Sequence, residues 1–240
     1  MKYILFTVAL VLATMVQAQE TIHTVKDANA ERRKVGSFSS IQAEGGIDIY
    51  VTQGKETGVA VSASTDEYRE SIVTEVRGNT LYIAFKYKNV WGNRMANPKA
   101  KAYVSVEILE SVNVSGACDL VVAGVLKSDD LKVILSGASN FKGEVQLNNC
   151  QFSMTGASDC RLTGKAERIK VQASGASSFK GYELNAGEAD INASGASDVQ
   201  MSISNSITVE ASGASSVHYK GEPRLKGIRV TGASSFSRKS

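Results

Sequence analysis

Residues 150–176 read CQFSMTGASDCRLTGKAERIKVQASGA, and the spacing within this stretch decides the fold. It holds a Thr-Gly-Ala triplet at 155–157 and a Ser-Gly-Ala triplet at 174–176, and such triplets occur seven times in the chain. Their central glycines lie 18 to 21 residues apart. A period of about this length is typical of stacked coils that share one continuous core. The repeat predicts a solenoid whose turns are formed at Gly116, Gly137, Gly156, Gly175, Gly195, Gly213 and Gly232.

Apolar and polar residues alternate before each central glycine. Ile169, Val171 and Ala173 precede Gly175 at every second position, and Phe179 follows it by four. Period two indicates strands with one buried face, so we expect each coil of about 19 residues to hold two or three short strands joined by turns. The alanine that follows every central glycine predicts a tight inward corner. Crossovers between parallel strands are almost always right-handed, so the predicted fold is all-β, a right-handed parallel β-helix or β-solenoid.

The preceding segment, residues 35–110, has strand signals without the triplet. Alternating runs at 47–51, 59–61, 72–76 and 81–85 predict half-buried strands, arranged as a β-rich cap or sandwich. Gly78-Asn79 predicts a hairpin turn between the last two runs, and Asp66 is a possible cap of a helical turn that ends at Ser71. We therefore divide the chain into a signal peptide (1–18), a polar lead-in (19–34), a β-rich N-terminal region (35–110) and the solenoid (111–240).

The N-terminal end has the features of a secretory signal. Lys2 supplies the charge, residues 4–16 are an apolar core, and a small-residue cleavage pattern ends at Ala18. We expect an exported chain, at the cell surface, extracellular or periplasmic, with no transmembrane segment once the signal is removed; an uncleaved anchor is the alternative. Without Lys2 the chain has 26 basic and 24 acidic side chains, which are interspersed, and nothing predicts nucleic-acid binding.

Cysteine and histidine content limits the possible chemistry. Cys150 and Cys160 occupy repeat positions that other coils fill with apolar residues, so we expect them and Cys118 to be buried, inert thiols. One disulfide with one leftover thiol is the alternative. His23 and His218 are the only histidines, too few for a histidine-built metal site or a catalytic triad. No cofactor is expected.

Three aspartates recur three positions after a central glycine, in alternate repeats: Asp119, Asp159 and Asp198. One interpretation is a ladder that binds Ca²⁺ or a sugar, because hard cations prefer several oxygen ligands. The other is that these residues favour turns and that alternation keeps like charges apart. If two repeats formed one coil, the aspartates would lie at adjacent levels. No Lys or Arg accompanies them at a fixed position, so catalysis is not expected.

The stretch 85–98 is the most distinctive segment outside the repeats. It contains Tyr87, Trp91 and Arg94, and exposed aromatic residues with arginine are typical of recognition loops. We regard these three residues as candidate partner contacts. The alternative is a hairpin tip whose Trp91 folds back to cover the cap or the end of the solenoid.

The Ser/Thr-Gly-Ala-Ser repeats and the preceding Glu44-Gly45-Gly46-Ile47-Asp48-Ile49 resemble the putative autotransporter adhesin head GIN domain family of Bacteroidetes-type bacteria. The resemblance covers about residues 35–235. It implies a fold similar to pectin-lyase-like β-helices, without their catalytic residues, and a role in cell adhesion.

We therefore expect a non-catalytic, exported β-solenoid that acts as a cell-adhesion or envelope-interaction module. Its partner would be a surface protein or a glycan, and the open end of the last coil could support a homo-oligomer. The alternatives are a structural scaffold in the periplasm or at the outer membrane and, with less support, a carbohydrate-active enzyme.

Overall fold

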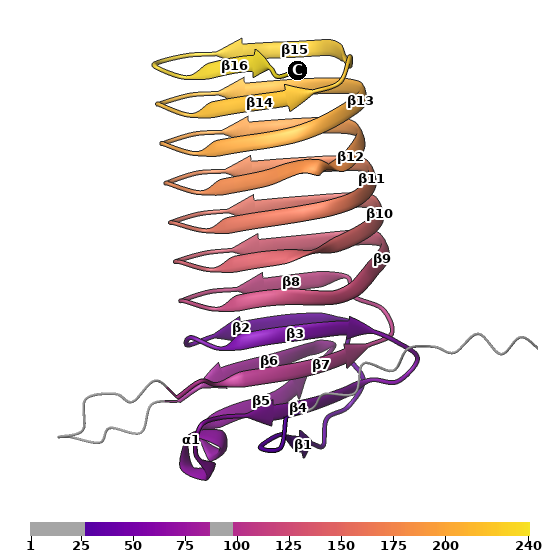
Figure 1. Ribbon diagram of the computed structural model, residues 1–240, viewed down its shortest axis with the longest axis vertical. Coiled ribbons are helices and arrows are strands. Elements are labelled where there is room, and N and C mark those ends of the chain that lie inside the picture. The colour runs from indigo at the N-terminus through magenta and orange to yellow at the C-terminus, as the bar shows by residue number, and fades with distance from the viewer. Residues whose placement is uncertain (1–26, 87–97) are drawn as a thin grey trace, which may run out of the picture.

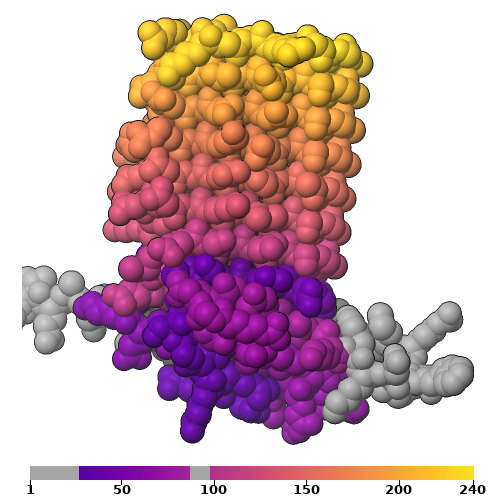
Figure 2. All heavy atoms as spheres, turned by 180° about the vertical axis from the view of Figure 1, so that it is seen from behind, coloured from indigo at the N-terminus to yellow at the C-terminus, as the bar shows by residue number. Residues whose placement is uncertain are grey.

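The computed structural model describes residues 27–86 and 98–240. It is a right-handed parallel β-solenoid of about seven turns, continued at its N-terminal end by a smaller set of mixed strands (Figure 1). From behind, the coils form regular layers that end at the C-terminal residues (Figure 2). The predicted fold class is confirmed.

Each central coil is one continuous strand that bends round the solenoid. These strands are β9 (Asp119–Leu135), β10 (Asn140–Met154), β11 (Asp159–Ala173), β12 (Ser178–Ala193) and β13 (Asp198–Ala211). The expectation of two or three short strands per coil is wrong, because the ladder continues through the bend. Glycine permits this: Gly164 has a φ of 105°, and a Cβ there would lie 2.1 Å from the carbonyl oxygen of Val145.

One repeat makes one coil. Asn140 pairs with Asp159 and Cys150 pairs with Ile169, so each residue of β10 lies beside its counterpart one repeat later. The ladder begins with β8 (Ser111–Val114), which pairs with β9, and ends with β14 (Ser216–Lys220), β15 (Arg224–Val230) and β16 (Ser235–Arg238).

The triplet forms the sharp turn between coils. Gly156 has a φ of 75°, and the N–H of Ala157 donates to the carbonyl oxygen of Gly137 in the preceding coil at 2.7 Å. The predicted inward corner at the alanine is wrong, because Ala157 lies exposed at the tip of the turn. The inward residue is Ser158, which is 1% exposed and whose hydroxyl donates to the carbonyl oxygen of Thr155 at 2.8 Å. Its hydrogen bond makes a buried hydroxyl tolerable in the corner.

Two further coils precede the repeats in space. β2 (Ser40–Glu44) and β3 (Asp48–Gln53) are joined by Gly45-Gly46, both with positive φ, and pair in parallel with β8 and β9. β6 (Thr80–Phe85) and β7 (Lys101–Val106) form the coil below, in parallel with β2 and β3. The coil of β2 and β3 therefore lies between segments that follow it in sequence.

Antiparallel strands and one short helix complete this end. β4 (Gly58–Ser62) pairs with β7 and with β1 (Glu31–Arg33), and β5 (Ile72–Arg77) pairs with β6 across the predicted Gly78-Asn79 hairpin. The helix α1 spans Asp66–Glu70. Its N-cap is Thr65, whose Oγ1 accepts the N–H of Tyr68, and not the expected Asp66. Thr65 has the extended backbone that an N-cap requires.

A single apolar core runs the length of the solenoid. Phe152 is fully buried and makes edge contacts with Phe141 and Phe179, with ring centroids 6.1 and 5.6 Å apart. All three cysteines are free and buried, as predicted. Among the described residues, none of the helical segments has the length and apolar character needed to cross a bilayer.

Candidate binding surface

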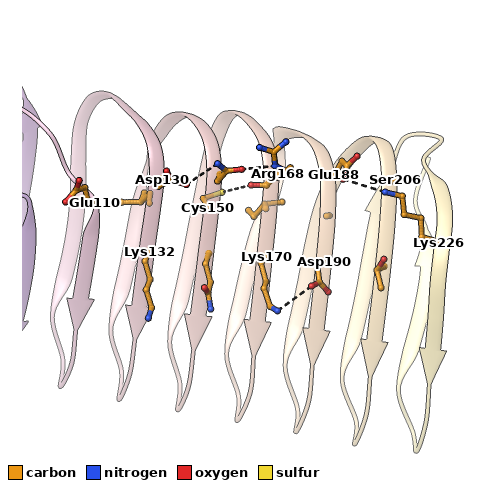
Figure 3. Close-up of a pocket in the computed structure, with 16 residues that line it drawn as sticks. Glu110, Asp130, Lys132, Cys150, Arg168, Lys170, Glu188, Asp190, Ser206 and Lys226 are labelled. Carbon is orange, nitrogen blue, oxygen red and sulfur yellow. Dashed lines mark hydrogen bonds and ion pairs between the residues drawn. The ribbon is translucent and has the colours of Figure 1, made fainter.

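A groove of about 640 Å³ runs along the solenoid axis, over the second half of the coils from β9 to β15 (Figure 3). We call it the axial groove. Its floor consists of inward-facing residues that are 3 to 7% exposed, namely Leu131, Cys150, Ile169 and Ala189. A bend row lies on one side of the floor: Asp130, Asn149, Arg168, Glu188 and Ser206. A strand row lies on the other: Lys132, Gln151, Lys170, Asp190 and Thr208.

The parallel register creates these rows. Residues at the same repeat position stack directly above one another, at about 4.8 Å per coil. Polar side chains flank each floor residue because strand residues alternate between the two faces. The groove is thus a periodic surface on which the same kind of contact can be repeated along the axis.

Contacts along the bend row link neighbouring coils. The Nδ2 of Asn149 donates to Oδ1 of Asp130 at 3.0 Å, and Nε of Arg168 donates to Oδ1 of Asn149 at 2.7 Å. Farther along, Nζ of Lys226 lies 3.6 Å from Oε2 of Glu188. Each of these groups keeps further hydrogen-bonding capacity towards solvent.

The strand row is more open. Nζ of Lys170 lies 3.5 Å from Oδ2 of Asp190, and both side chains are about half exposed. Lys132 has no ion-pair partner among the described residues (Figure 3). The floor offers no activated nucleophile, since burial raises the pKa of the Cys150 thiol to about 12.

The three predicted aspartates lie in one column outside the axial groove. Asp119 and Asp159 both pair with Asn140, and Asp159 and Asp198 both pair with Ser178, so one coil separates each aspartate from the next. The structure does not bring them together. Their use as an ion or sugar ladder stays a prediction.

Hydrogen-bond donors meet each of these carboxylates. Asn140 donates to Asp119 at 2.5 Å and Gln200 donates to Asp198 at 2.8 Å, while Lys180 forms an ion pair with Asp159. These contacts come from the same or a neighbouring coil.

Sequence reasoning missed a fourth member of the column. Asp48 of β3 lies directly beside Asp119, because the β2–β3 coil stacks on β9. Burial and then the charge of Asp119 raise the pKa of Asp48, while Lys101 opposes the shift. No triplet marks this coil, and only Gly45-Gly46 could have indicated it.

Tyr87, Trp91 and Arg94 lie outside the described residues, and their role as partner contacts stays a prediction.

The described residues include few of the metal-ligating and histidine side chains that catalytic sites commonly use. No group of three or more His, Cys, Asp and Glu side chains among them could hold a metal ion. Nδ1 of His218 lies 2.8 Å from Oγ of Ser237. In the coil below, the backbone partner of His218 is Gln200, whose side chain is an amide. His23 lies outside the described residues.

The stacked coils and their axial groove define a repeat protein with an extended lateral groove. The chain belongs to the family described as "Putative auto-transporter adhesin, head GIN domain", whose profile matches residues 37–223. The family predicted from the triplets is therefore confirmed. No curated protein matches the chain.

Solved structures share the fold. A putative adhesin from Bacteroides fragilis is 21% identical, with a TM-score of 0.79, over 88% of this chain and 96% of that one. A putative lipid-binding protein from Parabacteroides distasonis is 20% identical, with a TM-score of 0.63, over 89% and 98%. A putative adhesin from Parabacteroides merdae is 16% identical, with a TM-score of 0.66, over 88% and 95%.

Proposed function

We propose that the chain is a non-catalytic adhesion module whose axial groove binds a neutral, linear glycan at a cell surface. The observation that supports this most is the pair of polar rows, each with one residue from each of the five strands β9 to β13, that flank an apolar floor. A linear polymer laid along the axis would meet donors and acceptors at regular intervals. The name of the family and the names of the similar structures point to the same class of role.

The charge of the groove favours a neutral ligand. Four acidic and four basic side chains line it, so its formal charge is zero. A polyanion such as a nucleic acid would gain little there, because its binding depends on a surplus of Lys and Arg. Hydroxyl groups can both donate to the carboxylates and accept from Lys132, Gln151 and Lys170.

The groove favours weak contacts that act together. None of its lining residues is aromatic, so ring stacking does not contribute to affinity. Many copies of the protein on one cell would raise the overall avidity without any new contact. Weak individual sites are therefore compatible with adhesion.

A lipid ligand has less support in this chain. The floor residues are 3 to 7% exposed and offer little apolar surface to an acyl chain. A purely structural scaffold remains the runner-up, because the contacts of the two rows also link the coils. We further infer export from a Bacteroidetes-type cell, which agrees with the signal-like residues 1–18 and with the adhesin family.

The test is binding of the fluorescent mature chain to an array of neutral, acidic and basic linear glycans. Replacing Lys132 and Lys170 by alanine removes two strand-row donors from exposed positions. Lys142→Ala is the matched control, because Lys142 is exposed on the first half of β10, outside the groove. Hydrogen bonds from charged groups contribute about 1.5 to 3 kcal/mol each, so the groove variant should bind at least tenfold more weakly.

Neutral glycans should give the strongest signal, with the control equal to the unaltered chain and no cleaved product from the bound glycan. Binding by no glycan class, or equal binding by the groove variant and the control, would overturn the proposal. Release of reducing or unsaturated sugars would instead establish the carbohydrate-active enzyme.

A further inference from the structure

The inward-facing apolar residues of successive coils stack in columns along the solenoid axis. The C-terminal end face, formed by β15 and β16, exposes the last residues of these columns. Leu225, Ile228 and Val230 are 50, 39 and 39% exposed. In the coil below, Ile207 pairs with Leu225 and Val209 pairs with Ile228. Both of these partners are fully buried. In the other coils the following coil covers these positions. On this face no described residue does (Figure 1).

The backbone of β15 presents a strand edge on the same face. The N–H of Thr231 donates to the carbonyl oxygen of Ala211 at 2.9 Å, so Thr231 faces the coil below. Successive residues of a strand direct their backbone groups to opposite sides, and Val230 and Ile228 therefore face the open side. Among the described strands, β15 pairs only with β13 and β16 only with β14. After the extra residue at Lys226, the edge can accept one more strand along Ile228 and Val230.

The end face is strongly basic. Residues 223–240 contain five basic side chains and no acidic one, and these are Arg224, Lys226, Arg229, Arg238 and Lys239. Lys226 lies near Glu188 at 3.6 Å, and Arg238 pairs with Glu222 at 2.9 Å. Arg224, Arg229 and Lys239 have no ion-pair partner in the described part of the chain. A partner that covers this face must supply negative charge.

Charge and geometry argue against two other occupants. Two copies that met end to end would bring the ten basic side chains of their end faces together. Like charges at a strand edge discourage pairing between identical edges. A lipid bilayer is disfavoured too, because open N–H and C=O groups are costly in hydrocarbon.

We propose that the end face binds an extended acidic segment of another protein by strand addition to β15. Apolar residues of that segment would lie over Leu225, Ile228 and Val230, and acidic residues would alternate with them beside Arg224 and Arg229. Strand addition takes its affinity from main-chain hydrogen bonds and its specificity from alternate side chains. This site adjoins the axial groove at Lys226, but it uses the open edge of β15 and not the polar rows of the groove.

The chain itself contains a matched pair of probe peptides. Residues 188–195, EADINASG, have acidic residues at outward positions, and residues 168–175, RIKVQASG, have basic residues at the equivalent positions. Both derive from the same part of a coil and both end in Ser-Gly. The basic peptide is the more apolar of the two, so apolar contact alone would favour it.

The experiment is a fluorescence-polarisation titration of each labelled peptide with the mature chain. Two variants test the mechanism. Arg224→Glu with Arg229→Glu reverses the charge beside the edge. Val230→Pro removes an N–H that faces the open side, and proline is tolerated on edge strands. Lys142→Glu with Arg161→Glu is the control charge reversal, on exposed residues of the lateral surface. Circular-dichroism melts verify that every variant is folded.

The acidic peptide should bind at least tenfold more tightly than the basic one, less so at high salt. Its binding should fall at least tenfold in both end-face variants and be unchanged in the control. Equal affinity for the two peptides, no binding, or unchanged binding in Val230→Pro would overturn the proposal. So would sedimentation showing that the unaltered chain dimerises through this face, or a preference of the face for vesicles of anionic lipid.

Discussion

A methyl group added to one of the stacked central glycines of the triplets should be one of the most damaging substitutions in the solenoid. Gly156 has a φ of 75°, and a Cβ there would lie 2.5 Å from the carbonyl oxygen of Gly137 and 3.1 Å from its nitrogen. The left-handed conformation costs an alanine about 1–2 kcal/mol. The clash is with backbone, so the two coils must move apart, at a cost of about 1–3 kcal/mol. The bond from Ala157 N–H to Gly137 would weaken as well.

We therefore expect Gly156→Ala to lower the free energy of unfolding by about 3–5 kcal/mol, against a typical total of about 5–15 kcal/mol. Urea unfolding followed by far-UV circular dichroism measures this. Two control glycines separate the causes. Gly78 has a φ of 60° with nothing within 4 Å of an added Cβ, so Gly78→Ala should cost only the backbone strain. Gly58 has open space and no positive φ, so Gly58→Ala should be neutral or slightly stabilising.

The difference in unfolding free energy between Gly156→Ala and Gly78→Ala isolates the cost of the contact between successive glycines. If the two variants lose the same free energy, the contact between successive glycines does not limit the turn, and the stacking explanation of the triplet is wrong. Hydrogen exchange at Ala157 provides a local measurement should the coils unfold separately, as they can in repeat proteins.

Three further predictions concern the column of carboxylates, the thiols and the core. Asp48 has a raised pKa in the folded state, so the folded state holds this proton more tightly than the unfolded one, and stability is lost as the pH rises through the folded pKa. Asp48→Asn should therefore raise the unfolding free energy near neutral pH by about 0.2–1 kcal/mol, and thermal melts should show this gain shrinking in acid. Cys118, Cys150 and Cys160 are buried with raised pKa values, so Ellman's reagent should find no reactive thiol in the native chain and three after denaturation. Phe152→Ala should cost about 3–5 kcal/mol in urea unfolding, and Phe236→Ala, at a partly buried site, should cost less.

The repeat predicted the solenoid because it combines two independent constraints. The alternation in Ile169, Val171 and Ala173 fixes which side of the strand is buried, and the invariant glycine fixes where the chain turns. The role of the alanine could not be predicted in the same way. Whether Ala157 or Ser158 points inward depends on the direction in which a left-handed glycine sends the chain, and a buried serine is acceptable only because its hydroxyl reaches Thr155.

The site was less predictable than the fold. The alternating polar residues of the strand row were visible, but the groove depends on where each strand bends, and no residue type marks that bend uniformly. Asp48 escaped notice because its coil lies between later segments of the chain, and a non-sequential order cannot be inferred from a local pattern. The open end face could be anticipated from the last triplet. That its basic residues lie beside an open strand edge could be recognised only once β15 was placed at the end of the sheet.

Adhesion requires that the solenoid be exposed at the cell surface, and protease accessibility of the native protein on the cells that produce it measures this exposure. Intact and lysed cells are compared, with a periplasmic protein as the control for leakage. We expect cleavage on intact cells while the periplasmic control stays whole. Protection of the protein until lysis would contradict adhesion and would favour the periplasmic scaffold.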